Sequence, residues 1–165
     1  MKLYSTRSFL RSGPCLLCGL ATLSPAIASA QWLFPPSNPD AQRNALGEVR
    51  SQVNWLKNAT STAASYGERG YDSIWERFRS VRDAYATLKQ TLIPPQLAKG
   101  ANALAELDAG LDIIQESFGN YQADVSAGRA VNLALRDLCE VLRDASRLWL
   151  QEFNKICSQL RIGWG

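Results

Sequence analysis

Few residue types in this chain could do chemistry, because histidine is absent from the whole sequence. Without an imidazole, the chain cannot form a Ser-His or Cys-His nucleophile pair, a histidine-containing zinc site or a C-x-x-C-H haem attachment site with its axial histidine. The Glu-x-x-His di-iron site that some helical bundles carry is excluded for the same reason. We therefore expect no catalytic residues, no cofactor-binding residues and no metal ligands, and we expect a protein that is not an enzyme.

Two cysteines, Cys139 and Cys157, form the candidate disulfide of the chain. Their spacing corresponds to about five helical turns, so both thiols would face the same side of a helix. On a continuous helix they would lie about 27 Å apart, whereas a disulfide needs Cα atoms within roughly 4.4–6.8 Å. Three arrangements stay open. In the first, both cysteines are free thiols at the edge of the core. In the second, the helix is broken and the two cysteines form an internal bridge. In the third, two copies form an antiparallel homodimer in which Cys139 of each copy bonds Cys157 of the other.

Three carboxylates, Asp108, Asp112 and Glu116, recur at every fourth residue and would line up along one helix. Carboxylate oxygens are the ligands that hard cations such as Ca²⁺ prefer. These three positions fall outside the apolar stripe of their segment, however. We therefore expect a solvated acidic face rather than a cation site.

The elements that would position these residues are helices. Four segments carry apolar residues at alternating steps of three and four, which places them along one stripe of a helix. The stripes run from Leu46 to Ala63, from Ile74 to Leu92, from Leu104 to Val125 and from Leu135 to Leu160. They predict helices over residues 39–65, 72–92, 96–127 and 130–161, with a heptad-spaced, coiled-coil-like core.

Helix-capping residues stand where the first two helices should begin. Asn38 is a preferred N-cap, and Pro39 after it suits the first helical position. The loop at residues 66–70 separates the first two helices, and Asp72 is expected to cap the second.

Glycine and proline mark the helix ends further along the chain. Pro94 ends the second helix, Gly128 the third and Gly163 the fourth, because proline and left-handed glycine both stop a helix. The third helix also contains internal glycines, each of which weakens a helix by about 1 kcal/mol relative to alanine. These are the positions where that helix could bend or break: Gly100, Gly110 and Gly119.

Short connections make sequential helices antiparallel neighbours, so the predicted fold is all-α, an antiparallel up-down four-helix bundle. It would occupy residues 39–165 as one domain, after a lead segment at residues 31–38. The third helix has five anions and one cation over residues 96–127, and the other three are mildly basic. An acidic helix between basic neighbours is consistent with one compact unit.

The first 30 residues have the pattern of a cleaved bacterial signal peptide. A basic start with Lys2, Arg7 and Arg11 precedes a short apolar run, and residues 28–30 read Ala-Ser-Ala. Cleavage predicts export to the periplasm or the medium and leaves 15 cations against 15 anions, so charge gives no argument for nucleic acid. The apolar run is shorter than the roughly 20 residues that cross a bilayer, and we expect no transmembrane anchor.

Aromatic residues at the two ends of the exported chain form a candidate docking patch. Trp32 and Phe34 precede the first helix, and Trp164 follows the fourth. An even number of antiparallel helices places both ends together, beside the turn at Pro94. The alternative is that these rings fold over the bundle end as a hydrophobic lid. The other tryptophans lie in or beside the stripes and are expected in the core: Trp55, Trp75 and Trp149.

A leader ending ASA-QW is followed by the polar segment PPSNPDAQRNAL and by a long helix carrying VNWLKNATSTAASYG. This layout, which covers mainly residues 31–70, resembles that of the small exported subunits of conjugal-transfer and type IV secretion systems, a periplasmic, pilus-associated family. It implies a structural or adhesive role in a cell-envelope assembly, with protein partners and no chemistry.

Two functional hypotheses follow. The first is a non-enzymatic exported interaction protein, whose partners in the cell envelope dock at the aromatic ends. The alternative is a periplasmic bundle that binds an apolar small molecule, in a cavity where small residues leave room: Gly110, Gly119 and Ala145.

Overall fold

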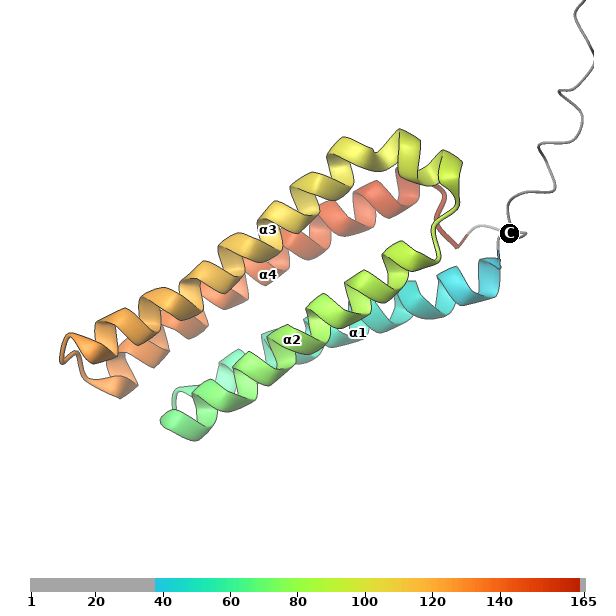
Figure 1. Cartoon of the computed structure of the whole chain (residues 1–165). Helices are drawn as coiled ribbons and strands as arrows, with labels where there is room; N and C mark the ends of the chain where they lie inside the picture. The colour runs from blue at the N-terminus through green and yellow to red at the C-terminus, as the bar shows by residue number, and fades with distance from the viewer. Residues whose placement is uncertain (1–37, 164–165) are drawn as a thin grey trace, which may run out of the picture. The chain divides into compact units, whose positions relative to one another are not determined.

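The computed structural model describes residues 38–163, which form four helices joined by short turns (Figure 1). The helices are α1 (Pro39–Ala63), α2 (Glu68–Gln90), α3 (Pro94–Ser126) and α4 (Val131–Gln159). Every predicted helix is present, no strand occurs in residues 38–163, and the predicted all-α four-helix fold is confirmed. The predicted leader and most of the lead segment fall outside these residues.

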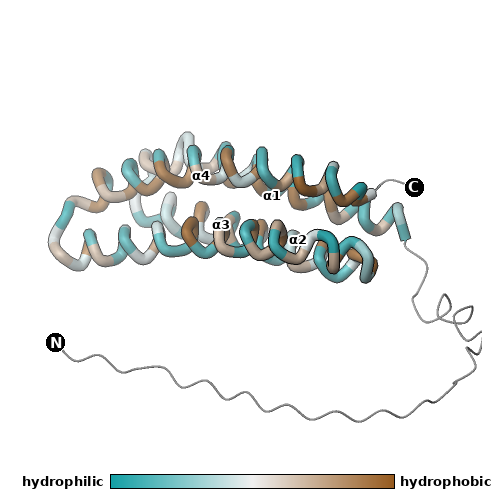
Figure 2. Tube along the Cα trace, turned by 90° about the horizontal axis from the view of Figure 1, so that it is seen from above, coloured by the Kyte–Doolittle hydropathy of each residue, from teal (hydrophilic) through white to brown (hydrophobic). Residues whose placement is uncertain are grey.

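The predicted apolar stripes form the core of the bundle. All their positions are buried except Ala145 and Val125, which are half-buried. The buried side chains of all four helices make one continuous hydrophobic cluster. Hydrophobic and hydrophilic residues alternate along the helices in Figure 2, as amphipathic helices around a shared core require.

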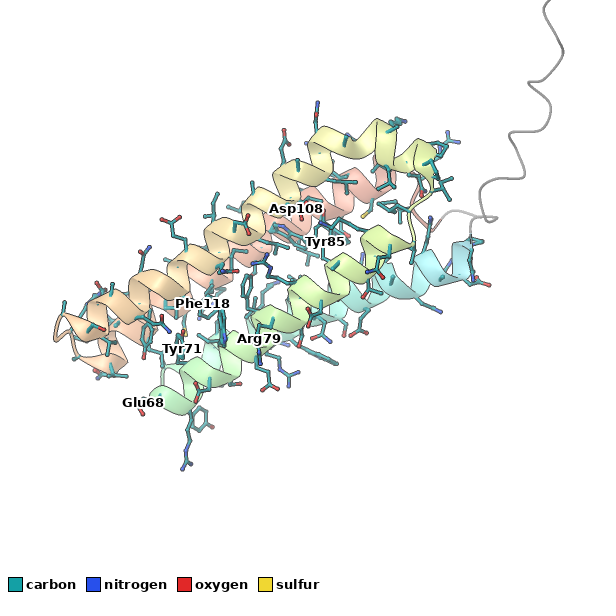
Figure 3. The ribbon with its side chains drawn as sticks, in the orientation of Figure 1. Glu68, Tyr71, Arg79, Tyr85, Asp108 and Phe118 are labelled. Atoms are coloured by element: carbon teal, nitrogen blue, oxygen red, sulfur yellow. The ribbon has the colours of Figure 1, made fainter. Side chains whose placement is uncertain are left out.

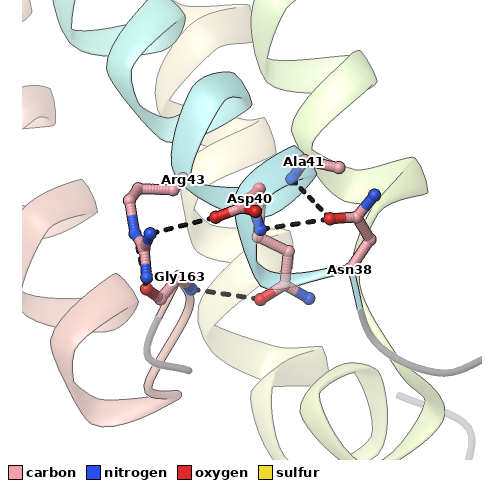
Figure 4. A network of polar contacts seen from close by, with 6 residues as sticks. Asn38, Asp40, Ala41, Arg43 and Gly163 are labelled. Carbon is pink, nitrogen blue, oxygen red and sulfur yellow. Dashed lines mark hydrogen bonds and ion pairs between the residues drawn. The ribbon is translucent and has the colours of Figure 1, made fainter.

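Helix α1 begins as its capping residues predict. The Asn38 side-chain oxygen accepts hydrogen bonds from the backbone N–H groups of Asp40 and Ala41, at 3.1 and 3.0 Å (Figure 4). Such a cap satisfies donors that the first helical turn leaves free. Gly128 ends the turn after α3 with φ +89°, also as expected.

Helix α2 begins four residues before the predicted cap, so Asp72 lies inside the helix and the prediction that it caps α2 is wrong. Gly67 at φ +57° reverses the chain instead, a conformation that glycine adopts without steric cost. Gly70 then packs on the end of α1, where a Cβ atom would meet the Ala63 carbonyl oxygen at 2.0 Å. The α1–α2 turn is therefore tighter than the loop that the sequence indicates.

Helix α4 also ends before its predicted stop. It finishes at Gln159, and the chain then turns through Arg161 at φ +53° and Gly163 at φ +75°. Gly163 therefore shapes the segment after the helix rather than its last turn.

Helix α3 is continuous through its three glycines. Two of them face α4 and its C-cap, because a Cβ at Gly110 would lie 2.9 Å from Trp149 Cδ1 and a Cβ at Gly100 would lie 2.5 Å from Cδ1 of the C-cap Leu160. A Cβ at Gly119 would meet nothing within 4 Å. Gly100 and Gly110 thus permit a close approach of α3 and α4 and do not break the helix.

The helices pack unequally around the bundle. Backbone contacts join α1 to α2, α3 to α4 and α1 to α4, whereas the backbones of α2 and α3 lie farther apart. Aromatic side chains fill the α2–α3 seam, as Figure 3 shows for Tyr71, Tyr85 and Phe118. Tyr71 stacks on Tyr121 with ring centroids 4.6 Å apart, and Phe118 meets Trp75 at 4.8 Å.

A buried amide network closes one end of the bundle. The Gln42 side-chain nitrogen donates to the Thr91 carbonyl oxygen (2.8 Å) and to Gln96 (2.9 Å), and the Gln42 side-chain oxygen accepts from the Gly163 backbone N–H (3.1 Å). Gln96 also donates to the Leu160 carbonyl oxygen. The network ties the start of α1, the α2–α3 turn and the end of the described chain together, so these three meet at one end as predicted.

Candidate functional site: an apolar groove between α3 and α4

A strongly apolar hollow lies on the outer side of the α3–α4 pair. It has a volume of about 350 Å³, and we call it the α3–α4 groove. Its lining is mostly hydrophobic, with one glutamate from each helix: Glu106, Leu107, Gly110, Ile113, Ile114, Ala145, Leu148, Trp149, Glu152 and Ile156. Two of the lining residues, Gly110 on α3 and Ala145 on α4, carry almost no side-chain volume and so leave room for the groove.

The floor of the groove is the indole of Trp149. Its ring N–H donates to the Leu107 carbonyl oxygen at 2.9 Å, and its ring stacks on Phe153 with centroids 5.1 Å apart. Tyr85 meets the same indole edge-on at 5.5 Å. A hydrogen bond and two aromatic contacts thus fix the ring, so the notch above it at Gly110 is preformed.

The sides of the groove expose large apolar side chains. Ile113 is 64% exposed and Leu148 is 56% exposed. Val141, one heptad before Leu148 on α4, is also exposed and continues the apolar strip toward the α3–α4 turn. A single exposed aliphatic side chain is ordinary. Several beside one preformed hollow are typical of interaction sites.

The rim of the groove carries negative charge. Glu106 on α3 and Glu152 on α4 both line it. Glu152 pairs with Lys155 at 3.2 Å, and no ion pair in residues 38–163 involves Glu106. Together, α3 and α4 carry nine anions and five cations. The arrangement suits an apolar group attached to a positively charged one.

No protein-family model, curated protein or solved structure significantly matches this chain. What the groove binds must therefore be inferred from its own chemistry. In residues 38–163, no helix combines the length and the apolarity needed to cross a membrane.

Two of the three small residues that were predicted to leave room for a cavity line the groove. Gly110 and Ala145 both line the groove, whereas Gly119 faces open space elsewhere on α3. The predicted docking patch of Trp32, Phe34 and Trp164 lies outside the described residues, so that prediction stands as it was made.

The two cysteines are buried, unbonded thiols. Cys139 is 2% exposed and Cys157 is 3% exposed, and α4 runs unbroken through both. An internal bridge needs a break in that helix, so this alternative is wrong. Burial raises the pKa of Cys157 to about 12 and also raises the pKa of Cys139, which keeps both thiols protonated and unreactive at neutral pH. A cross-link between two copies would require these sulfur atoms to become exposed.

The predicted acidic face of α3 borders α2. Asp108 pairs with Lys89 at 2.7 Å, and Asp112 pairs with Arg82 at 3.5 Å. The carboxylates are at least partly exposed, as expected, and the pairs join the acidic helix to its basic neighbour. No group of three histidine, cysteine, aspartate or glutamate side chains in residues 38–163 is arranged as a metal site.

The tryptophans divide in a way that sequence reasoning missed. Trp149 is buried and Trp75 is half-buried, but Trp55 is 47% exposed, so the prediction of a core position for Trp55 is wrong. Trp55 immediately precedes the buried stripe residue Leu56, and one residue on a helix is a rotation of about 100°. Trp55 does not belong to the apolar stripe of alternating three- and four-residue steps, and this was the signal in the sequence that it would be exposed.

Proposed function

We propose that this protein is an exported, non-enzymatic interaction protein and that the α3–α4 groove is where its partner docks. The observation that carries the proposal is the fixed Trp149 indole beneath exposed Ile113 and Leu148. A preformed pocket needs no ordering before it receives an apolar side chain, and buried apolar anchors supply most of the affinity of protein interfaces. The acidic rim favours a partner surface of basic character.

The proposed setting is a cell-envelope assembly, such as a conjugal-transfer or secretion apparatus. Support for export comes from the signal-peptide pattern of residues 1–30, and support for this setting comes from the resemblance over residues 31–70. The aromatic residues Trp32, Phe34 and Trp164 remain proposed as a second contact area for envelope partners.

A short amphipathic helical peptide made of leucine and lysine tests the groove. Methyl resonances of Ile113, Val141 and Leu148 should shift in NMR spectra when this peptide is added, because its leucines enter the groove and its lysines meet the acidic rim. A peptide of leucine and glutamate should shift them far less. Equal responses to both peptides, or none to the first, would contradict the proposal.

Two exposed leucines provide a matched comparison. Leu148→Ser removes an apolar side of the groove, whereas Leu97→Ser removes an exposed leucine that does not line it. We expect about tenfold weaker peptide binding for the first variant, which corresponds to roughly 1.4 kcal/mol, and unchanged binding for the second. Equal losses would show that the peptide binds the acidic surface without using the groove.

The size of the groove supports a second candidate function, binding of an apolar small molecule. Its volume of about 350 Å³ falls within the usual range of small-molecule sites. The acidic rim predicts that decylamine would raise the thermal unfolding temperature and shift the Ile114 methyl resonance, and that decanoate would do neither. A chain that responds to neither compound would rule this candidate out.

A further inference from the structure

A second exposed feature lies on the outer side of the α1–α2 pair, away from the α3–α4 groove. Trp55 is 47% exposed there and lies beside Arg77, whose guanidinium carbon is 5.4 Å from the centre of the tryptophan ring. Small polar residues border the pair: Asn58, Thr62 and Ser73. We call Trp55 and Arg77 the Trp55 knob. Exposed tryptophan and arginine are the residues most enriched among the strongest contributors to protein interfaces.

The knob and the groove lie at the same height along the bundle. Arg50 on α1 donates a hydrogen bond to Asn154 on α4 at 2.8 Å. Because α1 and α4 are antiparallel, a count of five residues along each helix from this pair brings Trp55 level with Trp149, the floor of the groove. The knob belongs to the outer face of α1 and α2 and the groove to the outer face of α3 and α4, so the two features lie back to back.

The two helix pairs that carry these features have opposite charge. Helices α1 and α2 together carry eight cations and six anions, whereas α3 and α4 carry five cations and nine anions. The charged residues at the two features are also opposite in sign: Arg77 is part of the knob, and Glu106 and Glu152 line the groove. The outer faces of one molecule are therefore complementary to each other in charge.

We propose that the occupant of the α3–α4 groove is the Trp55 knob of a second copy of this chain. The proposal rests on the proposed function of the groove and names its partner. The incoming indole lies over Gly110 and Trp149, and the incoming Arg77 reaches the carboxylates on the rim. Each copy keeps one free knob and one free groove, so the contact is heterologous and extends into open chains rather than closing as a dimer. One aromatic anchor makes a small interface, and the association is weak and reversible.

Sedimentation of the purified protein over a wide range of concentrations tests the proposal. The mass of the wild type should rise with concentration and pass beyond the dimer. Trp55→Ala removes the knob and Ile113→Lys places a cation in the groove, and each should weaken association by at least about 30-fold, the effect of losing a dominant interface residue. Both residues are exposed, so the fold is retained, which circular dichroism checks.

A mixture of the two variants gives the decisive result. Trp55→Ala retains a groove and Ile113→Lys retains a knob, so the two together should form a one-to-one dimer that grows no further, although neither assembles alone. Tyr66→Ala, at an exposed aromatic outside both features, should assemble like the wild type. High salt should weaken wild-type assembly, since Arg77 and the glutamates contribute.

Three results would overturn the inference: a wild type that stays monomeric at every concentration, a wild type that stops at a dimer, or a mixture that stays monomeric. The leucine–lysine peptide separates this failure from failure of the proposed function. If the peptide still binds the groove of a monomeric wild type, the groove docks a different partner. If the peptide also fails to bind, both proposals fall.

Discussion

The α3–α4 seam and the α2–α3 seam share helix α3, yet they are built by opposite means. At the α3–α4 seam, Gly100 and Gly110 let the helices approach so closely that a single added carbon would collide with α4. At the α2–α3 seam, Phe118 and Tyr121 meet the rings of α2 and hold the backbones apart.

This difference explains where the groove lies. Large rings fill much of the α2–α3 seam, and ion pairs bridge its outer edge. The hollow of about 270 Å³ that remains there has charged side chains from both helices in its lining, so it is not apolar: Arg82, Lys89, Asp108 and Asp112. Glycine brings two backbones together and adds no side chain of its own, so an apolar hollow remains at the α3–α4 seam with the largely buried Trp149 indole in its lining. One helix thus has a face that packs aromatic rings against α2 and another that lines the apolar groove.

The largest expected effect comes from emptying the ring-filled seam. Phe118→Ala removes a buried ring that contacts Tyr71, Trp75 and Phe78. We expect the free energy of unfolding to fall by about 3–5 kcal/mol, the usual cost of truncating a core aromatic residue. Denaturant unfolding measures this. A loss below about 1 kcal/mol would mean that the seam does not depend on its rings.

Alkaline pH should destabilise the same seam through Tyr85. The Tyr85 hydroxyl donates a hydrogen bond to the Leu104 carbonyl oxygen of α3 at 3.3 Å. Burial, followed by the nearby Asp108 charge, raises the pKa of Tyr85 well above its usual value of 10.0. The unfolded chain therefore loses this proton first. Stability from this group is complete below about pH 10 and declines as pH rises further, by at most about 1.4 kcal/mol per pH unit.

The variant Tyr85→Phe isolates this contribution. Cys157, whose pKa is raised from 9.0 to about 12, adds a decline in the same direction from about pH 9 and remains in the variant. Chemical unfolding between pH 8 and pH 11 should show a shallower decline for Tyr85→Phe than for the wild type. Identical slopes would mean that the tyrosine proton does not contribute to the stability of the seam.

Two glycines of α3 test the close packing of the α3–α4 seam, because they have the same intrinsic helix propensity but different surroundings. Gly119→Ala should stabilise the protein by about 1 kcal/mol, since its new methyl group enters open space. Gly110→Ala places the methyl group 2.9 Å from Trp149 Cδ1, and the resulting strain, about 1–3 kcal/mol, cancels or exceeds that gain. Thermal unfolding of both variants distinguishes them. Equal stabilisation would show that α3 and α4 are not closely packed at Gly110.

The smallest expected effect is at the ion pair on the edge of the α2–α3 seam. Lys89 and Asp108 are 2.7 Å apart, with both side chains at least one-third exposed. A double-mutant cycle with Lys89→Met and Asp108→Asn should give a coupling of about 0.5 kcal/mol that weakens with salt. A coupling of several kcal/mol would mean that charge, rather than aromatic packing, joins the two helices.

The sequence predicts the helices and the core because hydrophobic periodicity determines which stripe of each helix is buried. It does not identify the bonds of Gln42, because a polar residue in a helix gives no signal that distant backbone groups will meet it. Gly110 and Ala145 were predicted to leave room, and they do. Sequence alone could not tell them from Gly119, because the direction in which each glycine faces depends on how α3 is rotated against α4.

The exposure of Trp55 follows the same reasoning. Composition favours burial of tryptophan, whereas the position of Trp55 beside Leu56 rotates it off the buried stripe. At Trp55, residue type and helical phase disagree, and phase decides the outcome; Trp75, also one residue from its stripe, is half-buried because its ring packs on Phe118.

In the proposed function, the notch at Gly110 makes the α3–α4 groove a docking surface. The most direct test is the affinity of the leucine–lysine peptide for Gly110→Ala, followed by the Ile113 methyl resonance, with Gly119→Ala as the control. The claim predicts about tenfold weaker binding for Gly110→Ala and wild-type binding for Gly119→Ala. Wild-type affinity in a folded Gly110→Ala protein would contradict it.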